Sequence, residues 1–396
     1  MGQKVNLTMK RSTARILTTH AGVLAGPPEF ADIDLQVRTG KPYDMQTYEA
    51  LRRSSIVKTV RRQAEVGIDI VSDGELGKSR GYPYYSQRIT GIEQRALKPG
   101  EVPVTVRRSR EREAFGEFYE YLQKIDTRLA VPPGTRLICN GPLVHKGLGK
   151  LQDELDTFRA ALAGVKAEEA FFPVIAPGWL DHFMFNEHYP SDEAFIFAIA
   201  EILRPEYKGV VDAGFLLQVD DPGLPDAWPT FIPAPSIEEY RRYAAIRIEA
   251  LNYALEGIPE AKVRYHVCWG SHHGPHTEDI PLKHIVDLML KVRAQAYSLE
   301  AANARHEHEW KLWREVKLPE GKILIPGVVS HATNVIEHPE VVADRIVRYA
   351  GVVGRENVIA GSDCGMGGRV HPQIGWAKLR ALSEGAAIAS RELWPS

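Results

Sequence analysis

The chain has 396 residues, of which 44% are hydrophobic and 25% charged, proportions that are ordinary for a globular protein with a full-sized core. Its 49 Lys and Arg residues are balanced by 51 Asp and Glu residues, so the net charge of −2 gives no electrostatic reason to expect nucleic acid or an anionic membrane as a partner. No apolar run approaches the ~20 residues of a membrane helix, and residues 1–10 lack the apolar segment of a secretory signal. Three cysteines in a chain of this length do not make a disulfide framework, which favours a reducing cytoplasm as the location.

Eight short apolar runs, each ending in polar residues, follow one another along the chain. They cover residues 16–20, 68–75, 171–175, 215–220, 263–268, 296–300, 323–330 and 358–363. Segments with helical periodicity lie between them, at residues 56–66, 151–162, 194–203, 237–255, 282–292 and 339–352. Because strands that alternate with helices form parallel sheets, the pattern predicts an α/β fold. No Gly-rich phosphate loop opens a helix after any strand, which favours a single (β/α)8 TIM barrel over a doubly wound open sheet.

Two stretches do not fit the series of eight strand–helix units. We interpret them as insertions in one catalytic barrel domain spanning residues 1–396. The first insertion, near residues 91–145, contains many charges and an extra short strand at residues 136–143. Its basic cluster is expected to form a solvated loop or helix face, because the arginines are offset by neighbouring acids: Arg107, Arg108, Arg110 and Arg112, with Glu111 and Glu113. The second insertion, near residues 270–281, is rich in histidine.

Candidate metal ligands end three of the predicted strands. His266 and Cys268 project to the same side of the fifth strand, because side chains i and i+2 of a strand do so. Glu300 closes the sixth strand and Cys364 follows the eighth, on the same rim of a barrel. One nitrogen, one oxygen and two sulfurs make a tetrahedral Zn²⁺ site. A histidine and a cysteine packed in the core are the alternative for the HxC motif alone, and Cys139 is expected to be such a buried, small hydrophobic residue.

These motifs resemble those of the cobalamin-independent methionine synthase family. The similarity to its zinc motifs lies in His266-Val267-Cys268, Ser298-Leu299-Glu300 and Ser362-Asp363-Cys364-Gly365. Further matches fall in the family's order: Thr18-Thr19, Asp73-Gly74-Glu75, Gln218-Val219-Asp220-Asp221-Pro222, Ser330-His331 and Arg369. The resemblance covers about residues 16–369 and concerns the family's catalytic C-terminal half, with epoxyalkane:coenzyme M transferases as related enzymes.

The resemblance implies a barrel of the uroporphyrinogen decarboxylase and methionine synthase type that works as a zinc-dependent methyltransferase. In such enzymes a zinc-bound thiol, homocysteine, takes the methyl group of a methylated folate, since zinc lowers the pKa of the thiol. His331 and Asp363 match positions that handle the proton of the leaving group. Glu75 and Asp220 match positions that hold the amino group of homocysteine, although the sequence leaves open whether Asp220 or Asp221 faces inward.

Three further residues complete the expected substrate site. Asp73 and His20 lie on the same rim, where an acid such as Asp73 or Glu75 can alternatively cap the next helix. Trp179 lies in a segment that partly resembles the family's folate-stacking segment, and it either stacks on a pterin or lines an apolar pocket.

One departure from the family keeps other substrates open. The family's first strand ends in Gly-Ser, whose serine helps to hold homocysteine, and here Val23 takes the serine's place. The alternative is therefore a thiol alkyltransferase with another donor or acceptor, such as an epoxide and coenzyme M. A zinc hydrolase is a further alternative, which is disfavoured because thiolate ligands reduce the acidity of zinc towards water. A non-catalytic thiol-binding or metal-binding barrel fits poorly with so many polar residues on the rim.

Two histidine clusters remain outside the family's motifs. His272, His273 and His276 form a second metal site, a substrate lid or, as we favour, a polar loop without metal. The cluster at residues 305–309 is expected on a surface helix, because histidines at i and i+2 of a helix do not face each other. The expected partners are a small-molecule thiol and an alkyl donor, with a homo-oligomer left open.

Overall fold

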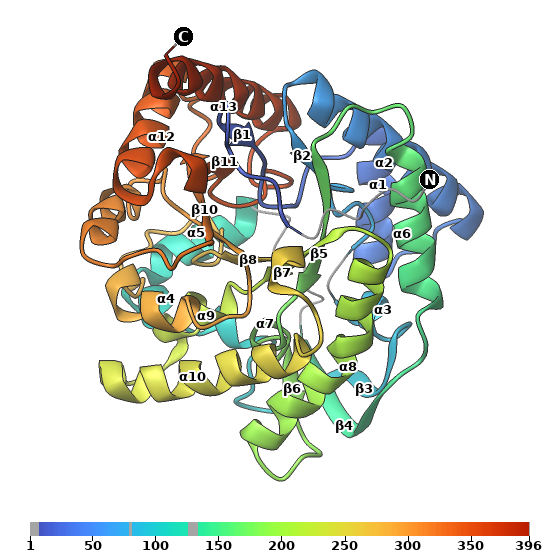
Figure 1. Ribbon diagram of the computed structural model, residues 1–396. Coiled ribbons are helices and arrows are strands. Elements are labelled where there is room, and N and C mark those ends of the chain that lie inside the picture. Colours follow the sequence, from blue (N-terminus) through green and yellow to red (C-terminus); the bar gives the residue numbers. More distant parts are fainter. Residues whose placement is uncertain (1–7, 79–80, 126–133, 396) are drawn as a thin grey trace.

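Eight parallel strands form one sheet in the computed structural model, which describes residues 8–78, 81–125 and 134–395 (Figure 1). Their order in the sheet is β1-β11-β10-β9-β8-β7-β5-β2. The bounds are β1 Leu17–Thr18, β2 Ile70–Val71, β5 Glu169–Ile175, β7 Leu216–Asp220, β8 Val263–Val267, β9 Ala296–Leu299, β10 Ile323–Val329 and β11 Ile359–Ser362. All eight predicted strands are present, and each lies within or close to the predicted range.

The two outermost strands of this order, β1 and β2, meet and close the sheet into a barrel. The Asp69 amide donates a hydrogen bond to the Thr18 carbonyl at 3.1 Å. The Thr19 hydroxyl donates to the Ile70 carbonyl at 3.0 Å. The predicted (β/α)8 barrel is therefore confirmed.

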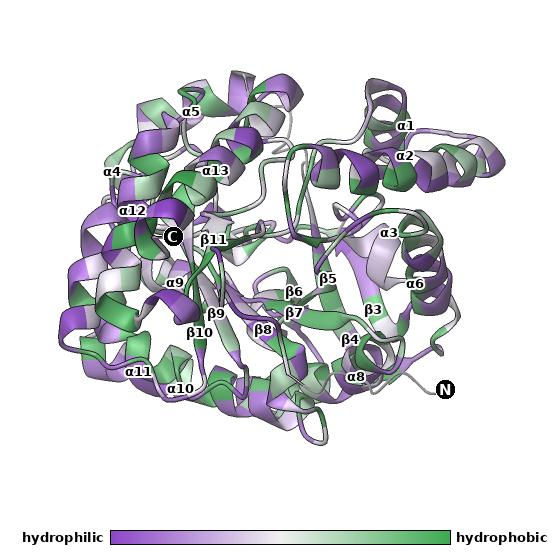
Figure 2. Ribbon diagram, turned by 45° about the horizontal axis from the view of Figure 1, so that its top comes forward, coloured by the Kyte–Doolittle hydropathy of each residue, from purple (hydrophilic) through white to green (hydrophobic). Residues whose placement is uncertain are grey.

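Helices surround the barrel and cover the outer face of the sheet (Figures 1 and 2). The longer ones are α1 Pro28–Arg38, α2 Met45–Glu65, α5 Gly116–Ile125, α6 Gly149–Ala161, α8 Asp192–Asp212, α10 Ile237–Ala254, α12 Pro339–Val353 and α13 Pro372–Leu393. Their starts follow from the sequence: Ser236 and Glu239 form a reciprocal capping box at α10, and Pro339 occupies the first turn of α12. Within the described ranges, no helix combines the length and apolarity needed to cross a membrane.

The predicted helix at residues 282–292 is wrong as a continuous element. The chain forms only a 3-10 turn, η5 Leu282–His284, and one helical turn, α11 Val286–Met289. Ile285, Leu288 and Val292 are all buried at helical spacing, so the periodicity correctly marks the residues that pack inward although the backbone does not continue as one helix.

Side chains inside the barrel change from apolar to polar along β7 and β9. The end near the strand starts is filled by a separate apolar cluster: Met9, Leu17, Ile70, Phe171, Leu216, Ala296, Ile323, Ile325 and Ile359. Two residues further along the same faces lie Gln218 and Ser298, and two residues further again lie Asp220 and Glu300. The strand period of two therefore places a packed floor beneath a polar rim, as TIM barrels do.

The first insertion forms a second, smaller sheet beside the barrel. Strand β3 Ile89–Ala96 pairs antiparallel with β4 Thr135–His145, and β6 Met184–Asn186 adds parallel to β4. The extra strand predicted at residues 136–143 is thus present and slightly longer.

The basic cluster of this insertion is less solvated than predicted. The Arg110 guanidinium donates to the carbonyls of Trp228 and Phe231 at 2.9 and 2.6 Å. Glu111 is only 4% exposed. The prediction of a solvated face is wrong for these two residues, because α4 Arg110–Ala114 packs against the loop that follows α9 Gly223–Asp226.

Gly327 on β10 leaves room for a carboxylate that belongs to the polar rim. A Cβ atom at this position would lie 2.1 Å from Oδ1 of Asp363. We therefore expect Gly327→Ala to lower the free energy of unfolding by about 1–3 kcal/mol, the usual cost of overpacking. Urea denaturation measures the change.

Gly351→Ala is the control for this substitution. A Cβ atom added to Gly351, which lies in α12, would meet nothing within 4 Å. The control should therefore be neutral or slightly stabilising. Equal stability of Gly327→Ala and the wild type would contradict the tight approach of the Asp363 carboxylate.

Candidate metal centre

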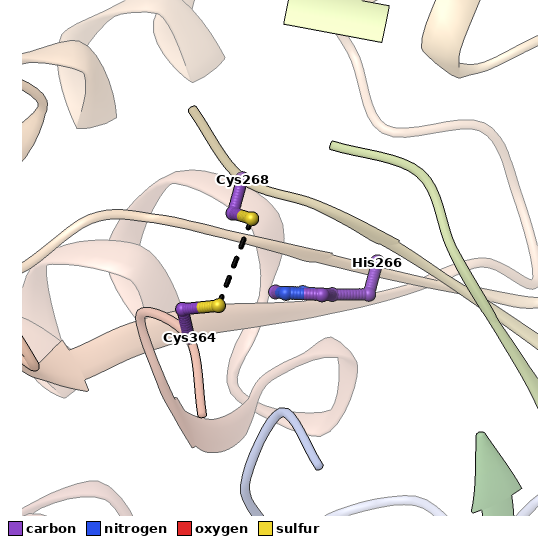
Figure 3. A group of neighbouring side chains, drawn as sticks. All are labelled: His266, Cys268 and Cys364. Atoms are coloured by element: carbon purple, nitrogen blue, oxygen red, sulfur yellow. Dashed lines mark hydrogen bonds between the residues drawn. The ribbon is translucent and has the colours of Figure 1, made fainter. Parts of the chain in front are cut away.

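His266, Cys268 and Cys364 converge at the end of the barrel where the strands finish (Figure 3). His266 is on β8, Cys268 follows β8 directly, and Cys364 lies two residues beyond β11. One ligand atom from each residue lies within 4.8 Å of the others, and the two sulfurs are 3.6 Å apart. The three side chains are between 2% and 9% exposed. Three of the four predicted metal ligands therefore form one compact, buried group.

The geometry of this group fits a zinc ion. Two sulfurs bound to one tetrahedral zinc at about 2.3 Å lie about 3.8 Å apart, close to the separation seen here. The Ser298 hydroxyl contacts Nδ1 of His266 at 3.2 Å, while Nε2 of His266 is buried without a hydrogen-bond partner among the described residues. Figure 3 shows the imidazole ring extending towards the sulfurs. A cation would satisfy this nitrogen, which is otherwise costly to bury.

The two thiols differ in acidity. Their mutual hydrogen bond is the largest cause, and it lowers the pKa of Cys364 while it raises the pKa of Cys268. His266 and His331 lower the pKa of Cys364 further, because both imidazoles lie close to its sulfur. Cys364 is therefore the sulfur that becomes a thiolate first.

Glu300, the fourth predicted ligand, is buried beside this group but is held by the protein. Its Oε1 accepts a hydrogen bond from the Trp269 amide at 3.0 Å, and its Oε2 accepts one from the Asn303 side-chain amide at 2.6 Å. Burial, helped by the nearby Asp363, raises the pKa of Glu300 to about 8. Glu300 is not among the three side chains within 4.8 Å of one another, so its role as a ligand stays a prediction.

Asp363, a predicted catalytic residue, anchors the segment that follows Glu300. Its Oδ1 accepts hydrogen bonds from the amides of Ala301 and Ala302 at 2.7 and 2.8 Å. Its Oδ2 accepts a third bond from Asn303 at 3.2 Å. Asp363 thus connects the ends of β9 and β11, and its part in proton transfer stays a prediction.

His331, the other predicted catalytic residue, lies directly in the site. It follows β10 by two positions and is 2% exposed. Its Nδ1 is buried without a hydrogen-bond partner in the described part of the chain. Burial lowers the pKa of His331 to about 3 although Cys364 is close, so the ring is neutral near pH 7. A buried ring nitrogen to which no described residue forms a hydrogen bond can accept one from a ligand, and the part of His331 in proton transfer stays a prediction.

Of the neighbouring aspartates Asp220 and Asp221, it is Asp220 that faces the barrel interior. Asp220 pairs in register with His266 and therefore lies on the same side of the sheet. Its Oδ1 accepts a hydrogen bond from the Gln218 amide at 2.7 Å. Asp221 points the opposite way, where its Oδ2 accepts from the Tyr265 hydroxyl at 2.7 Å. Asp220 is thus the aspartate that reaches the site.

Glu75 and Asp73 belong to a tight turn after β2. Glu75 has a φ of 57°, a left-handed conformation that is unusual for this residue type and that clusters at functional sites. Its carboxylate fills the space beside Gly22, where a Cβ would lie 2.2 Å from Oε1. Asp73 caps this turn, since its Oδ1 accepts from the Glu75 amide at 3.0 Å, and it forms an ion pair of 2.9 Å with Lys78. Asp73 therefore positions Glu75.

His20, predicted to bind substrate, is engaged within the protein at both ring nitrogens. Nε2 bonds to the Gln63 side chain at 2.8 Å, and Nδ1 accepts from the Gly22 amide at 3.1 Å. Burial lowers the pKa of His20 to about 4. Both ring nitrogens are therefore occupied by hydrogen bonds within the protein and are not available to a ligand. The bond to the Gly22 amide stabilises the turn at that residue.

Trp179 lines a cavity of about 240 Å³ formed by the first insertion and by loops at the same ends of the strands. Trp179 lies in α7 Pro177–Leu180, and its ring contacts the Phe183 ring edge to face. Asp226 also lines the cavity, where it is 9% exposed. The other lining residues come from four segments: Val104, Val106, Arg107, Ser109, Glu111, Arg112, Pro229, Thr230, Gly270, His272, Glu278 and Asp279.

The histidine-rich loop is fixed to the rim by its own side chains. His272 lies 3.5 Å from a Glu111 carboxylate oxygen, and His273 contacts the His331 carbonyl at 3.3 Å. His276 bonds through Nδ1 to Asp279 at 3.0 Å. The favoured interpretation of a polar loop near the site without metal stays a prediction, as do the alternatives of a lid and of a second metal site.

The cluster at residues 305–309 is only partly on the surface, which corrects the predicted surface helix. His306 and Glu309 are 3% and 8% exposed, whereas His308 is exposed. His306 bonds to Asp279 at 3.1 Å and to Glu309 at 2.9 Å, and its ring stacks on Trp269 with centroids 3.9 Å apart. These contacts bury one side of η6 Glu307–Arg314, a 3-10 helix, against the histidine-rich insertion.

One buried arginine at the site was missed by the sequence prediction. Arg264 is 1% exposed inside the barrel, where it donates to the Thr19 hydroxyl and the His20 carbonyl, each at 3.0 Å. Its guanidinium lies over the Phe171 ring at 4.0 Å. The sequence could have indicated this residue. Arg264, His266 and Cys268 occupy alternate positions of one strand, so their side chains project to the same side.

The fold and the site together define a (β/α)8-barrel protein with a candidate soft-ligand metal centre at the C-terminal ends of its strands. Comparison with known families is consistent with this arrangement. The family of cobalamin-independent synthase catalytic domains matches residues 184–387. The chain therefore belongs to the cobalamin-independent methionine synthase family.

Relatives of known sequence span nearly the whole chain. The methionine synthase of Thermococcus kodakarensis is 26% identical over 349 residues, which cover 87% of this chain and 84% of that protein. The methionine synthase of Pyrococcus furiosus is 26% identical over 328 residues, which cover 83% and 79%. A solved B12-independent methionine synthase from a Shewanella species, in complex with selenomethionine, has the same fold with a TM-score of 0.73 at 20% identity, covering 96% of this chain and 99% of that one.

Proposed function

We propose that this protein is a zinc-dependent alkyltransferase that activates a small-molecule thiol for S-methylation. The observation that carries the proposal is the buried group of His266, Cys268 and Cys364. The two sulfurs are 3.6 Å apart, and Nε2 of His266 has no hydrogen-bond partner in the described ranges. Glu300 is the proposed fourth ligand. Bound zinc would stabilise a substrate thiolate at neutral pH. Free thiols at this centre need a reducing compartment, in agreement with a cytoplasmic enzyme.

The chain's own residues would bind and orient the acceptor. Asp220 and Glu75 present carboxylates on the rim, which suit the ammonium group of an amino-acid thiol such as homocysteine. His331, whose buried Nδ1 has no hydrogen-bond partner among the described residues, is the proposed group that handles the proton of the leaving atom. The relatives are methionine synthases, which agrees with homocysteine as the acceptor.

A different acceptor is the second candidate, and Val23 is the observation that favours it. Val23 is half-buried beside the segment after Cys364, where the Gly367 amide donates to its carbonyl at 3.0 Å. Its side chain offers no hydroxyl to an amino-acid carboxylate. An acceptor without that carboxylate, such as coenzyme M with an epoxide as donor, needs no hydroxyl at this place.

The alkyl donor would occupy the cavity lined by Trp179. This cavity and the metal group lie at the same end of the barrel, since Gly270 of the cavity wall follows Cys268 by two residues. Trp179 and Phe183 supply flat apolar walls, and the carboxylate of Asp226 supplies an acceptor for N–H groups. A methylated folate presents both a flat ring and N–H donors, which supports it as the donor.

Cys268→Ser and Cys364→Ser should each lose most of the bound zinc, because each removes one of the soft ligands. Metal analysis after dialysis against a weak chelator measures the zinc content. Cys139→Ser is the matched control, because Cys139 is equally buried but bonds to the Gly141 carbonyl on β4, and it should retain zinc. Full zinc in both rim variants would reject the metal centre and with it the proposed function.

Trp179→Ala should raise the KM for methylated folate about tenfold, because the loss of a stacking partner costs roughly 1.5 kcal/mol. Steady-state kinetics at saturating thiol measures the change, and the zinc content should stay that of the wild type. Trp394→Ala, at the C-terminal end of α13, is the control. A KM that does not change in Trp179→Ala would place the donor elsewhere.

A further inference from the structure

Asn303 connects the two segments that hold the metal group's acidic neighbours. Its side-chain amide donates to Oε2 of Glu300 at 2.6 Å and to Oδ2 of Asp363 at 3.2 Å. Its own oxygen is also fixed, because it accepts from the amides of Arg305 and His306 at 3.0 and 3.1 Å. The orientation of the Asn303 amide is therefore determined, with its N–H groups directed at carboxylates.

This connection holds together two buried acids that repel each other. Glu300 and Asp363 are 3% and 0% exposed, and they lie at the ends of β9 and β11. Like charges buried at short range are unfavourable unless a hydrogen-bond donor or a cation lies between them. Asp363 immediately precedes Cys364, so any movement between the two carboxylates also changes where Glu300 lies relative to that sulfur.

We propose that Asn303 is a positioning residue of the metal centre, which clamps Glu300 to Asp363 and so sets the place of the Glu300 carboxylate relative to Cys364. The inference rests on the proposed zinc site and names a residue that acts through Glu300 without binding the metal itself. Hydrogen-bond partners of metal ligands typically change metal affinity by 10–100-fold when they are removed.

The other oxygen of Glu300 is also held by a hydrogen bond, so both oxygens of the carboxylate are fixed. The Trp269 amide holds Oε1, and the Trp269 ring is fixed by its stacking on His306 and by a hydrogen bond from its indole to the Ile280 carbonyl at 2.8 Å. His306 is in turn held by Asp279. His306, together with His276, which bonds to the same Asp279 carboxylate, is thus part of the support of Glu300.

The test compares the zinc affinity of the wild type and of Asn303→Leu, measured on the full-length protein by competition with a chromogenic chelator. Leucine keeps the branched shape of asparagine but removes both donors, so we expect a 10–100-fold weaker affinity. Cobalt substitution adds a second readout: the sulfur-to-cobalt bands should persist, while the ligand-field bands shift. Asn334→Leu, in the exposed loop after His331, is the matched control and should bind zinc like the wild type. If Asn303→Leu does not fold, Asn303→Ser replaces it in the same comparison.

A double-mutant cycle shows whether Asn303 acts through Glu300. In a Glu300→Gln background, Asn303→Leu should change the zinc affinity less than about threefold, because the group that it positions is already altered. An unchanged affinity in Asn303→Leu alone, or an equal loss in both backgrounds, would overturn the inference while leaving the zinc site in place. A wild type that binds no zinc would instead reject the proposed function and the inference together.

Discussion

The site depends on the burial of two thiols, an imidazole and two carboxylates within one small region of the barrel rim. Cys268 and Cys364 lie 3.6 Å apart, and the imidazole of His266 is directed at them. Burying such groups is expensive unless their charge and their lone pairs are shared. A divalent cation satisfies the thiols and the imidazole at once, since thiolate and imidazole are the ligands that zinc prefers. Most other features of the rim serve to hold these groups in place.

The barrel provides this placement through its strand period. The register of β7, β8 and β9 brings Asp220, His266 and Ser298 to one level above an apolar floor, and Cys268 and Glu300 follow two residues further along. Further contacts fix the segments beyond the strands: Gly327 on β10 admits the carboxylate of Asp363, and Asp363 anchors the segment after Glu300. The protein thus combines a rigid scaffold with short hydrogen-bonded turns, which hold the candidate ligands in place without a bound substrate.

Those features of the fold and the site that depend on strand periodicity could be predicted from the sequence. Those that depend on loop conformation could not. The eight strands and the convergence of His266, Cys268 and Cys364 follow from apolar runs whose ends share a rim. The internal bonds of His20 and the burial of His306 could not be foreseen, because they depend on contacts with Gln63 and Asp279 that are distant in the chain. Asn303 could not be predicted for a different reason: it is close to Glu300 in the chain, but an asparagine in a turn has no pattern that marks it as a partner of that carboxylate.

X-ray absorption at the zinc edge tests the central claim most directly, because it counts the sulfur atoms bound to the metal in the zinc-loaded protein. The wild type should show the two sulfurs of Cys268 and Cys364 with lighter ligands, and the addition of the substrate thiol should bring a third sulfur to the zinc. A coordination sphere without sulfur, or one that a thiol substrate leaves unchanged, would contradict thiol activation at this centre.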